Sequence, residues 1–449
     1  MTRSCHVINA AALRFLARLA ISTGLYSRSQ PEAMLKIPQH WDVRPFYGWY
    51  VVLAIGLVLM TESGLAFYNL AVLLDAFIRE RGFPVALASS ATASYFLASG
   101  IGGVVAARVM ERMDARVIMI SGACLSSIAL ACVGLLHRPW ELFAFHVVFG
   151  FCYGCCGLVP ATTIIARWFE ARRPLALSIA STGLSLGGIV VTPPAALLIA
   201  RVGLAGAAPW MGLGFFLGVV PVTALIVRAS PFHMGLEPDG WRVGTRPSRK
   251  AAVRNVTFAD ARRSRFFIAL TAAYIFTLGA QVGAIAHLFR LVSTRETGKA
   301  AMLAVAMMAA ASVVGRLCGG WFLLRLPTRG FALAMFAIQA AALVVLSAAR
   351  TQSLLLAGTV LLGASVGNVL MLQPLLLVEA FGLRDYGRLY SLSQLLTAIG
   401  VAGGPVLVGV INAATSGYTV PYLVVAVASL VGLALLLLSG RPQVEGRNS

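Results

Sequence analysis

The chain has 449 residues, of which 59% are hydrophobic and only 12% are charged, and its formal net charge is +20. A soluble domain carries charge on roughly a quarter of its residues, so this composition excludes a soluble globular protein. A basic surface for nucleic acid is a second reading of the net charge. We set it aside because the Lys and Arg residues are scattered over short segments between apolar blocks.

Twelve apolar blocks follow one another along the chain, most of them long enough to cross a hydrocarbon core of about 30 Å. The first six blocks span residues 49–74, 89–107, 117–136, 140–163, 175–200 and 209–227. The second six span residues 266–289, 300–324, 330–349, 353–378, 389–413 and 420–439. Each block is predicted to be a helix, because backbone that faces lipid must satisfy its own hydrogen bonds.

The blocks divide the chain into five parts. Residues 1–44 are predicted to be an N-terminal extension, with Met34 as an alternative start, and residues 45–228 a first six-helix bundle. Residues 229–265 carry most of the only long polar stretch and are predicted to be a partly disordered linker. A second six-helix bundle over 266–440 and a tail over 441–449 complete the chain.

Charge asymmetry predicts the orientation. If both termini are cytoplasmic, the segments on that side hold 27 of the 36 Lys and Arg residues, and the opposite loops hold 8. This distribution is the positive-inside pattern. We therefore expect a multi-pass protein of the inner membrane with both termini in the cytoplasm.

An internal repeat relates the two bundles. At a constant offset of 212 residues, Phe169 falls on Phe381, Arg172 on Arg384 and Gly188 on Gly400. Such a match indicates duplication, and because each half has an even number of spans, the two halves share one orientation. The predicted fold is therefore an all-α membrane protein with twelve transmembrane helices in two parallel-repeat six-helix bundles. That architecture places a substrate site near the midplane, between the halves.

Two ionisable residues lie inside predicted spans. Arg316 is the single charge in "MMAAASVVGRLCGGWFLL", and Glu62 lies in "LAIGLVLMTESGLAF". An ionisable group at that depth indicates a functional site. Arg316 either binds an anionic substrate or extends to the nearer interface, and its position alone does not decide between the two. Glu62 either couples proton movement to substrate occupancy or serves helix packing.

Uncharged polar residues within the spans are candidates for the wall of the same cavity. They are Tyr68 and Asn69 in the first span, Gln281 in the seventh, and Asn368 and Gln373 in the tenth. A hydrogen bond between helices is the structural alternative for each of them.

Several motifs resemble the major facilitator superfamily over residues 44–440. The loop "GGVVAARVMERMDAR" is similar to its gating motif, with Glu111 where an aspartate is usual. The segments "YGWYVV", "ARWFEARRPLALSIASTG", "SVVGRLCGGW" and "SPFHMGLEPDG" resemble the bacterial relatives of monocarboxylate transporters and oxalate:formate antiporters. The resemblance implies that Arg316 holds a substrate carboxylate. Ser312 stands where mammalian carriers have an aspartate, which puts their route of proton coupling in doubt.

The gating motif also implies a role for charges in the loops. Glu111, Arg112, Arg116, Arg172 and Arg173 are expected to form cytoplasmic ion pairs and helix caps that close the lower side of the outward-open state. The alternative is that these arginines reflect membrane topology alone.

The remaining features exclude other functions. The seven cysteines have no accompanying histidine cluster, and no GxxxxGKST loop is present, so we expect no metal, no cofactor and no enzyme activity. The predicted function is secondary transport of a small organic monocarboxylate by proton symport or anion exchange. The expected partners are an anionic solute, a proton or counter-anion and the lipid bilayer, and the chain is expected to be monomeric. The alternatives are efflux of a drug-like compound and a non-transporting receptor or sensor on the same scaffold.

Overall fold

The structure is a computed structural model that describes residues 46–240, 256–415 and 417–440. The predicted N-terminal extension, the middle of the predicted linker and the predicted tail lie outside these residues. Contacts group Phe46–Ser449 into one compact unit. The description below concerns the described part of that unit.

The first half of the unit is helical throughout its spans. Its helices are α2 (Gly48–Glu62), η1 (Ser63–Phe67), α3 (Asn69–Arg81), α4 (Val85–Val109), α5 (Ala115–Cys132), η2 (Val133–Leu135), α6 (Pro139–Cys156), α7 (Leu158–Trp168), α8 (Arg173–Leu186), η3 (Gly187–Val191) and α9 (Thr192–Leu225). Two of these, η1 and η3, are π-helical turns inside longer helices.

The second half follows a short ordered segment that contains η4 (Pro231–Met234) and η5 (Pro238–Gly240). Its helices are α10 (Phe258–Arg263), α11 (Arg265–Arg295), α12 (Gly298–Phe322), α13 (Thr328–Ala348), α14 (Gln352–Phe381), α15 (Tyr386–Thr415) and α16 (Thr419–Leu438). Polar caps fix where several of them begin: Ser264, Thr297 and Thr351 accept backbone N–H groups at the starts of α11, α12 and α14. The described residues contain no β-strand.

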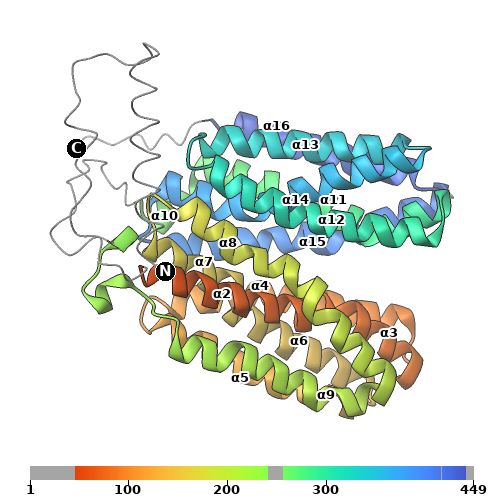
Figure 1. Cartoon of the computed structure of the whole chain (residues 1–449), viewed down its shortest axis with the longest axis horizontal. Coiled ribbons are helices and arrows are strands. Elements are labelled where there is room, and N and C mark those ends of the chain that lie inside the picture. Colours follow the sequence, from red (N-terminus) through yellow and green to blue (C-terminus); the bar gives the residue numbers. More distant parts are fainter. Residues whose placement is uncertain (1–45, 241–255, 416, 441–449) are drawn as a thin grey trace, which may run out of the picture. The chain divides into compact units, whose positions relative to one another are not determined.

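Eleven helical stretches among the described residues are long and apolar enough to cross a membrane. One of them, Arg173–Leu225, has 53 residues and covers two of the predicted spans. Gly203 interrupts it with φ 71° and ψ 171°, a conformation that suits glycine. Figure 1 shows this stretch running to one end of the molecule and turning back there. The structure thus has eleven such stretches among the described residues where the sequence predicted twelve, and the difference lies in this one long stretch.

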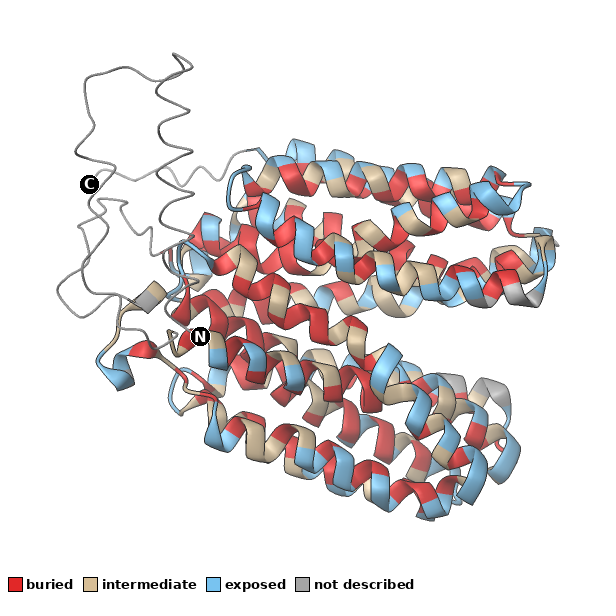
Figure 2. Ribbon diagram, viewed as in Figure 1, coloured by how far each residue is buried: buried red, intermediate tan, exposed pale blue. Residues whose placement is uncertain are grey.

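The helices form two groups. Helices α2 to α9 pack among themselves, and so do α11 to α16 (Figure 1). The main contacts between the groups are α4 with α15 and α8 with α12. Each of these pairs joins the second span of one predicted half to the fifth span of the other, which is the pattern that a two-fold relation between repeats predicts. Figure 2 shows that buried residues concentrate between the packed helices.

The two ends of the helices differ in their loops. The loops at 110–114, 169–172, 323–327 and 382–385 lie at the end that also carries α10, and they hold Arg112, Arg172, Arg325 and Arg384. We call this the basic end. The turn at Gly203 lies at the opposite end, where Glu80 accepts a hydrogen bond from the backbone N–H of Leu204 at 2.8 Å.

Candidate functional site

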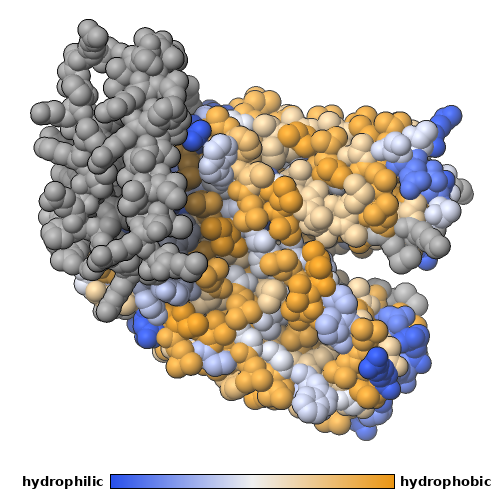
Figure 3. All heavy atoms as spheres, viewed as in Figure 1, coloured by the Kyte–Doolittle hydropathy of each residue, from blue (hydrophilic) through white to orange (hydrophobic). Residues whose placement is uncertain are grey.

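A cavity of about 220 Å³ lies between the two groups of helices, and Figure 3 shows the groups separated by a gap toward the end opposite the basic end. The first group contributes residues from η1, α4, α6, α7 and α8, and the second group contributes residues from α11, α14 and α15. Its position between the two groups agrees with the prediction of a site between the halves.

The described residues in the cavity wall are all uncharged. The polar ones from the first group are Ser63, Tyr68, Ser99 and Tyr153, and those from the second group are Gln281, Ser391, Gln394 and Thr397. Phe67 and Phe96 add two further aromatic rings to the first group's side. The wall thus offers hydroxyl, phenol and amide groups beside aromatic faces, a combination that suits an organic solute.

The first span reaches the cavity through a π-turn. Ser63 and Phe67 belong to η1, and Tyr68 follows it directly. The turn packs against the second π-turn, η3, and Thr192, the first residue of α9, donates a hydrogen bond to the Gly64 carbonyl at 2.8 Å. A β-carbon on Gly187 would lie 2.7 Å from the Gly64 nitrogen, so glycine is required for this approach. Single π-turns of this kind are frequent at functional sites.

Arg316 lies where α8, α12 and α14 meet. Its side chain is 1% exposed, which contradicts the alternative that it extends to the membrane interface. Its Nε donates a hydrogen bond to the Gly367 carbonyl at 2.7 Å, and its Nη1 donates to the Ser181 carbonyl of the other group. No carboxylate of the described residues pairs with it. The guanidinium is therefore a buried charge satisfied only by neutral acceptors.

Arg316 is not among the residues that form the cavity wall. Tyr68, which is 39% exposed and belongs to the wall, is the described ionisable residue that interacts electrostatically with the guanidinium. Ser312, four residues before Arg316, forms a hydrogen bond with Ser185 of α8 at 3.0 Å.

Glu62 is buried inside the first group. Both of its carboxylate oxygens are inaccessible and accept no hydrogen bond of normal geometry from the described residues. The Cys156 thiol and the rings of Tyr95 and Tyr153 lie around it. Tyr153 also belongs to the cavity wall, so one residue that interacts with the carboxyl group also lines the cavity. Arg316 is not among the described groups that interact with Glu62.

The model of the Major Facilitator Superfamily matches residues 53–349 and 297–449 of this chain. The chain belongs to the Major Facilitator Superfamily. Membership agrees with the fold and with the helices described above, and it makes the chain a multi-pass membrane protein. It does not by itself identify a solute.

Individual relatives of this superfamily member match it in part. The MFS-type transporter pynF of Aspergillus niger is 27% identical over 134 residues, which are 29% of this chain and 30% of that protein. The MFS transporter asaE of Aspergillus flavus is 22% identical over 340 residues, 75% of this chain and 73% of that protein. Monocarboxylate transporter 1 of Homo sapiens is 32% identical over 82 residues, 18% of this chain and 16% of that protein. The chain thus spans about a third of the length of pynF.

Solved structures of the superfamily resemble the whole described unit. The proton:xylose symporter XylE has a TM-score of 0.69 at 12% identity, over 87% of this chain and 95% of that one. The human organic anion transporter MFSD10 has a TM-score of 0.62 at 17% identity, over 88% of this chain and 100% of that one. At such identities the likeness establishes the fold alone.

The structure places the other predicted polar residues apart. Gln281 and Tyr68 lie in the cavity wall, whereas Asn69, Asn368 and Gln373 do not. Asn368 donates to the carbonyls of Gly315 and Ala364 at 2.9 Å each. The remaining two residues also contact neighbouring helices: Asn69 donates to the Met211 sulfur at 3.6 Å, and Gln373 donates to Ser393 at 2.8 Å. In this conformation these three amides connect helices.

Sequence reasoning missed the part of the wall that α15 provides. Ser391, Gln394 and Thr397 follow one another at intervals of three residues, which is the spacing of one helix face. Such a row of polar residues on one face of an apolar span could have indicated a cavity wall from the sequence. Gln339, which was also missed, accepts a hydrogen bond from Gln281 at 3.0 Å and so fixes the orientation of that cavity residue.

The loop charges at the basic end have different partners. Glu111 forms an ion pair at 3.3 Å with Arg388 of α15, which joins the two groups of helices. Two of the other predicted gating residues form contacts within their own group. Arg116 pairs with Asp114 at 2.8 Å, and Arg173 donates to the carbonyls of Phe169 and Ala166. Among the ion pairs between described residues, Glu111 is the predicted gating residue that pairs across the two groups.

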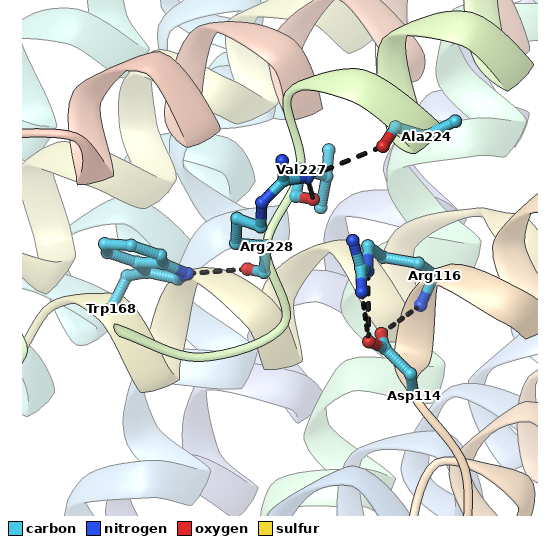
Figure 4. A network of polar contacts seen from close by, with 6 residues as sticks. All are labelled: Asp114, Arg116, Trp168, Ala224, Val227 and Arg228. Atoms are coloured by element: carbon cyan, nitrogen blue, oxygen red, sulfur yellow. Dashed lines mark hydrogen bonds and ion pairs between the residues drawn. The ribbon is translucent and has the colours of Figure 1, made fainter. Parts of the chain in front are cut away.

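The start of the predicted linker is ordered and docked on the first group. The Asp239 carboxylate accepts hydrogen bonds from the backbone N–H groups of Glu170, Ala171 and Arg172, at 2.8 to 3.3 Å. Nearby, the Trp168 ring donates a hydrogen bond to the Arg228 carbonyl at 2.7 Å (Figure 4). Asp239, the residue before the last in "SPFHMGLEPDG", thus holds the loop before α8.

Proposed function

We propose that this protein is a secondary active transporter that moves a small organic monocarboxylate across the cytoplasmic membrane by alternating access. The observation that carries the proposal is the buried Arg316, which has no carboxylate partner among the described residues and interacts electrostatically with Tyr68 of the cavity wall. Burying a charge is costly unless the charge is paired and hydrogen-bonded. A planar guanidinium pairs with a carboxylate through two parallel hydrogen bonds, so a monocarboxylate is the partner that fits.

Substrate binding at Arg316 would alter the contacts between the two groups. The guanidinium now donates to the carbonyl of Ser181 in the first group and to that of Gly367 in the second. A carboxylate is a stronger acceptor than a carbonyl group, and it would displace one or both. Displacement of Ser181 breaks a hydrogen bond between the groups. Binding would thereby favour a different arrangement of the two groups, as alternating access requires.

Glu62 is the residue through which we expect protons to act. A charged carboxylate without hydrogen-bond partners is costly in a buried site, so uptake and release of a proton at Glu62 would change the energy of its surroundings. Tyr153 connects this carboxyl group to the cavity. Proton symport needs Glu62 for net movement of the solute, whereas anion exchange does not.

The orientation follows from the distribution of charge. With the basic end in the cytoplasm, the gap between the groups opens to the outside, and the Glu111–Arg388 ion pair lies on the closed, cytoplasmic side. The partial match to Monocarboxylate transporter 1 of Homo sapiens supports the proposed class of solute over 18% of this chain.

Uptake by reconstituted vesicles tests the proposal. A panel of labelled monocarboxylates is supplied with and without a pH gradient to the wild type and to the Arg316→Gln, Arg316→Lys and Arg325→Gln variants. Loss of one partner from a buried ion pair costs about 3–5 kcal/mol, so Arg316→Gln should lower uptake about 100-fold or more. Arg316→Lys keeps the charge but loses the paired geometry, and its uptake should lie in between.

The Arg325→Gln variant is the matched control, because Arg325 is an exposed arginine that stacks on Trp321 at the basic end. It should transport like the wild type. If the Arg316→Gln variant took up every accepted carboxylate at the wild-type rate, that result would show that Arg316 does not bind the substrate. Binding of a carboxylate without flux by the wild type would favour a receptor instead.

A second candidate is efflux of an uncharged amphipathic compound. The uncharged and partly aromatic cavity wall favours it, as does the absence of Arg316 from that wall. This candidate predicts that removal of an aromatic ring, as in Phe96→Ala, lowers transport while Arg316→Gln leaves it unchanged. The carboxylate proposal predicts that Arg316→Gln has the larger effect.

A further inference from the structure

A second hollow lies on the outer side of the second group. Its volume is about 420 Å³, within the range of ligand pockets, which begin at about 300 Å³. Phe267, Ile268, Thr271, Ala272 and Ile275 of α11 form one side, and two leucines of α15 form the other. It shares no residue with the central cavity.

The walls of this groove belong to two membrane-spanning helices. The residues of α11 recur at intervals of three and four, so they form one face over about 12 Å of helix. Leu392 and Leu396 of α15 are four residues apart and face the same hollow. Ile268 is 57% exposed and Leu396 is 36% exposed, so the groove opens outward to the surroundings of the spans. In a bilayer those surroundings are acyl chains.

Two arginines close the groove at its basic end. Arg262 and Arg263 are the last residues of α10, and both are exposed. Neither forms an ion pair with a carboxylate of the described residues. Arg262 lies 5.7 Å from the centre of the Phe258 ring. Two guanidinium groups without a carboxylate partner among the described residues therefore lie at the mouth of an apolar groove.

The short helix that carries these arginines is firmly placed. The backbone N–H of Phe258 donates to Asp385 at 2.8 Å, and the guanidinium of Arg388 lies 4.3 Å from the centre of the Phe258 ring. Ala261, on the inner face of this helix, is fully buried. Arginines are expected at this end from the positive-inside pattern alone. A fixed helix that joins two of them to an apolar groove is not explained by topology.

From these observations we infer that the groove binds one anionic phospholipid of the leaflet at the basic end. The phosphate would lie against Arg262 and Arg263, whose guanidinium groups match phosphate oxygens through paired hydrogen bonds. One acyl chain would fill the apolar groove between α11 and α15. A free phosphate would use only the arginines and would leave the groove empty, so the apolar wall favours a lipid.

This site is also connected to the ion pair between the groups. Arg388 contacts the Phe258 ring of α10 and the Glu111 carboxylate of the first group. A lipid that holds α10 in place therefore supports Arg388 in the position in which it pairs with Glu111. An anionic lipid should thus favour the conformation closed at the basic end.

The test uses the purified full chain and native mass spectrometry, with phosphatidylglycerol titrated against phosphatidylcholine. Each arginine near a lipid surface contributes about a fivefold factor in affinity, so the Arg262→Gln/Arg263→Gln double variant should bind phosphatidylglycerol about 30-fold more weakly. The Arg325→Gln/Arg384→Gln variant removes the same charge from the same end and should bind like the wild type. Equal losses in both variants would show nonspecific attraction and overturn the inference.

Two further arms test the groove itself. Ala272→Phe leaves both arginines in place and fills part of the groove, so it should also weaken phosphatidylglycerol binding; undiminished binding would overturn the inference. Soluble glycerol phosphate should not displace the lipid, and displacement would show a phosphate site without an acyl chain. The exposed arginine variants retain the packed core and do not depend on how Ala272→Phe folds. Because the groove shares no residue with the central cavity, the result is independent of the transported solute.

Discussion

Replacement of Gly187 by alanine tests how closely the first and fifth spans approach. The new β-carbon would lie 2.7 Å from the Gly64 nitrogen, and nearer still to the Met60 carbonyl oxygen and the Ser63 hydroxyl. The hydroxyl can rotate away, but the other two atoms are backbone, so the two helices must separate. Overpacking of this kind costs about 1–3 kcal/mol.

Helix propensity acts in the opposite direction. The backbone at Gly187 has φ −57° and ψ −46°, which is helical, so alanine itself should be favoured there by up to about 1 kcal/mol. We therefore expect a net loss of about 1–2 kcal/mol in the free energy of unfolding. Gly403→Ala is the matched control, because a β-carbon there would meet no atom within 4 Å. That variant should be neutral or more stable than the wild type.

The assay is reversible unfolding of the purified chain in mixed micelles with increasing denaturing detergent, followed by circular dichroism. The difference between the two alanine variants is the quantity of interest, since both gain the same propensity. If Gly187→Ala unfolds at the same detergent fraction as Gly403→Ala, the close contact between the two π-turns is not present in the membrane protein.

Four further single variants test the basic end and the buried acid. Glu111→Gln and Arg388→Gln each remove a partly exposed ion pair worth about 0.2–1 kcal/mol. The population closed at the basic end, measured by spin-label distances, should therefore fall by up to about fivefold. An additional loss in the double variant would contradict a direct pair. Asp239→Ala leaves three N–H groups without their acceptor, and amide exchange at 170–172 should accelerate, whereas unchanged exchange would count against this cap. Glu62→Gln should abolish uptake driven by a pH gradient and preserve solute exchange at equal pH, and gradient-driven uptake at the wild-type rate would refute a proton role.

The fold could be predicted from the sequence because each span is a long apolar block whose length is set by the bilayer. The interruptions could not be predicted in the same way. The break at Gly157 between α6 and α7 and the turn at Gly203 each depend on one glycine. Many other glycines in this chain continue a helix without a break.

The candidate site was predicted in part. The place of Arg316 in an apolar block did not decide between a buried site and extension to the interface, and the structure shows the residue buried. The cavity wall depends on how each helix is rotated, which the overall hydropathy of a span does not reveal; Gln281 therefore faces the cavity while Gln373 faces a neighbouring helix. Glu111 and Arg388 are far apart in the chain, and nothing in the sequence around either residue indicates that they form an ion pair.

The π-turn Ser63–Phe67 determines where two different side chains point. Such a turn contains one residue more than a regular turn, and one residue corresponds to about 100° of rotation about the helix axis. Glu62 precedes the extra residue and faces the interior of the first group, whereas Tyr68 follows it and faces the shared cavity. Shortening this turn by one residue would restore an uninterrupted helix. The Tyr68 phenol would then turn away from the cavity, while Glu62 would keep its position. The number of residues in the turn, more than their identity, sets the angle between the two side chains.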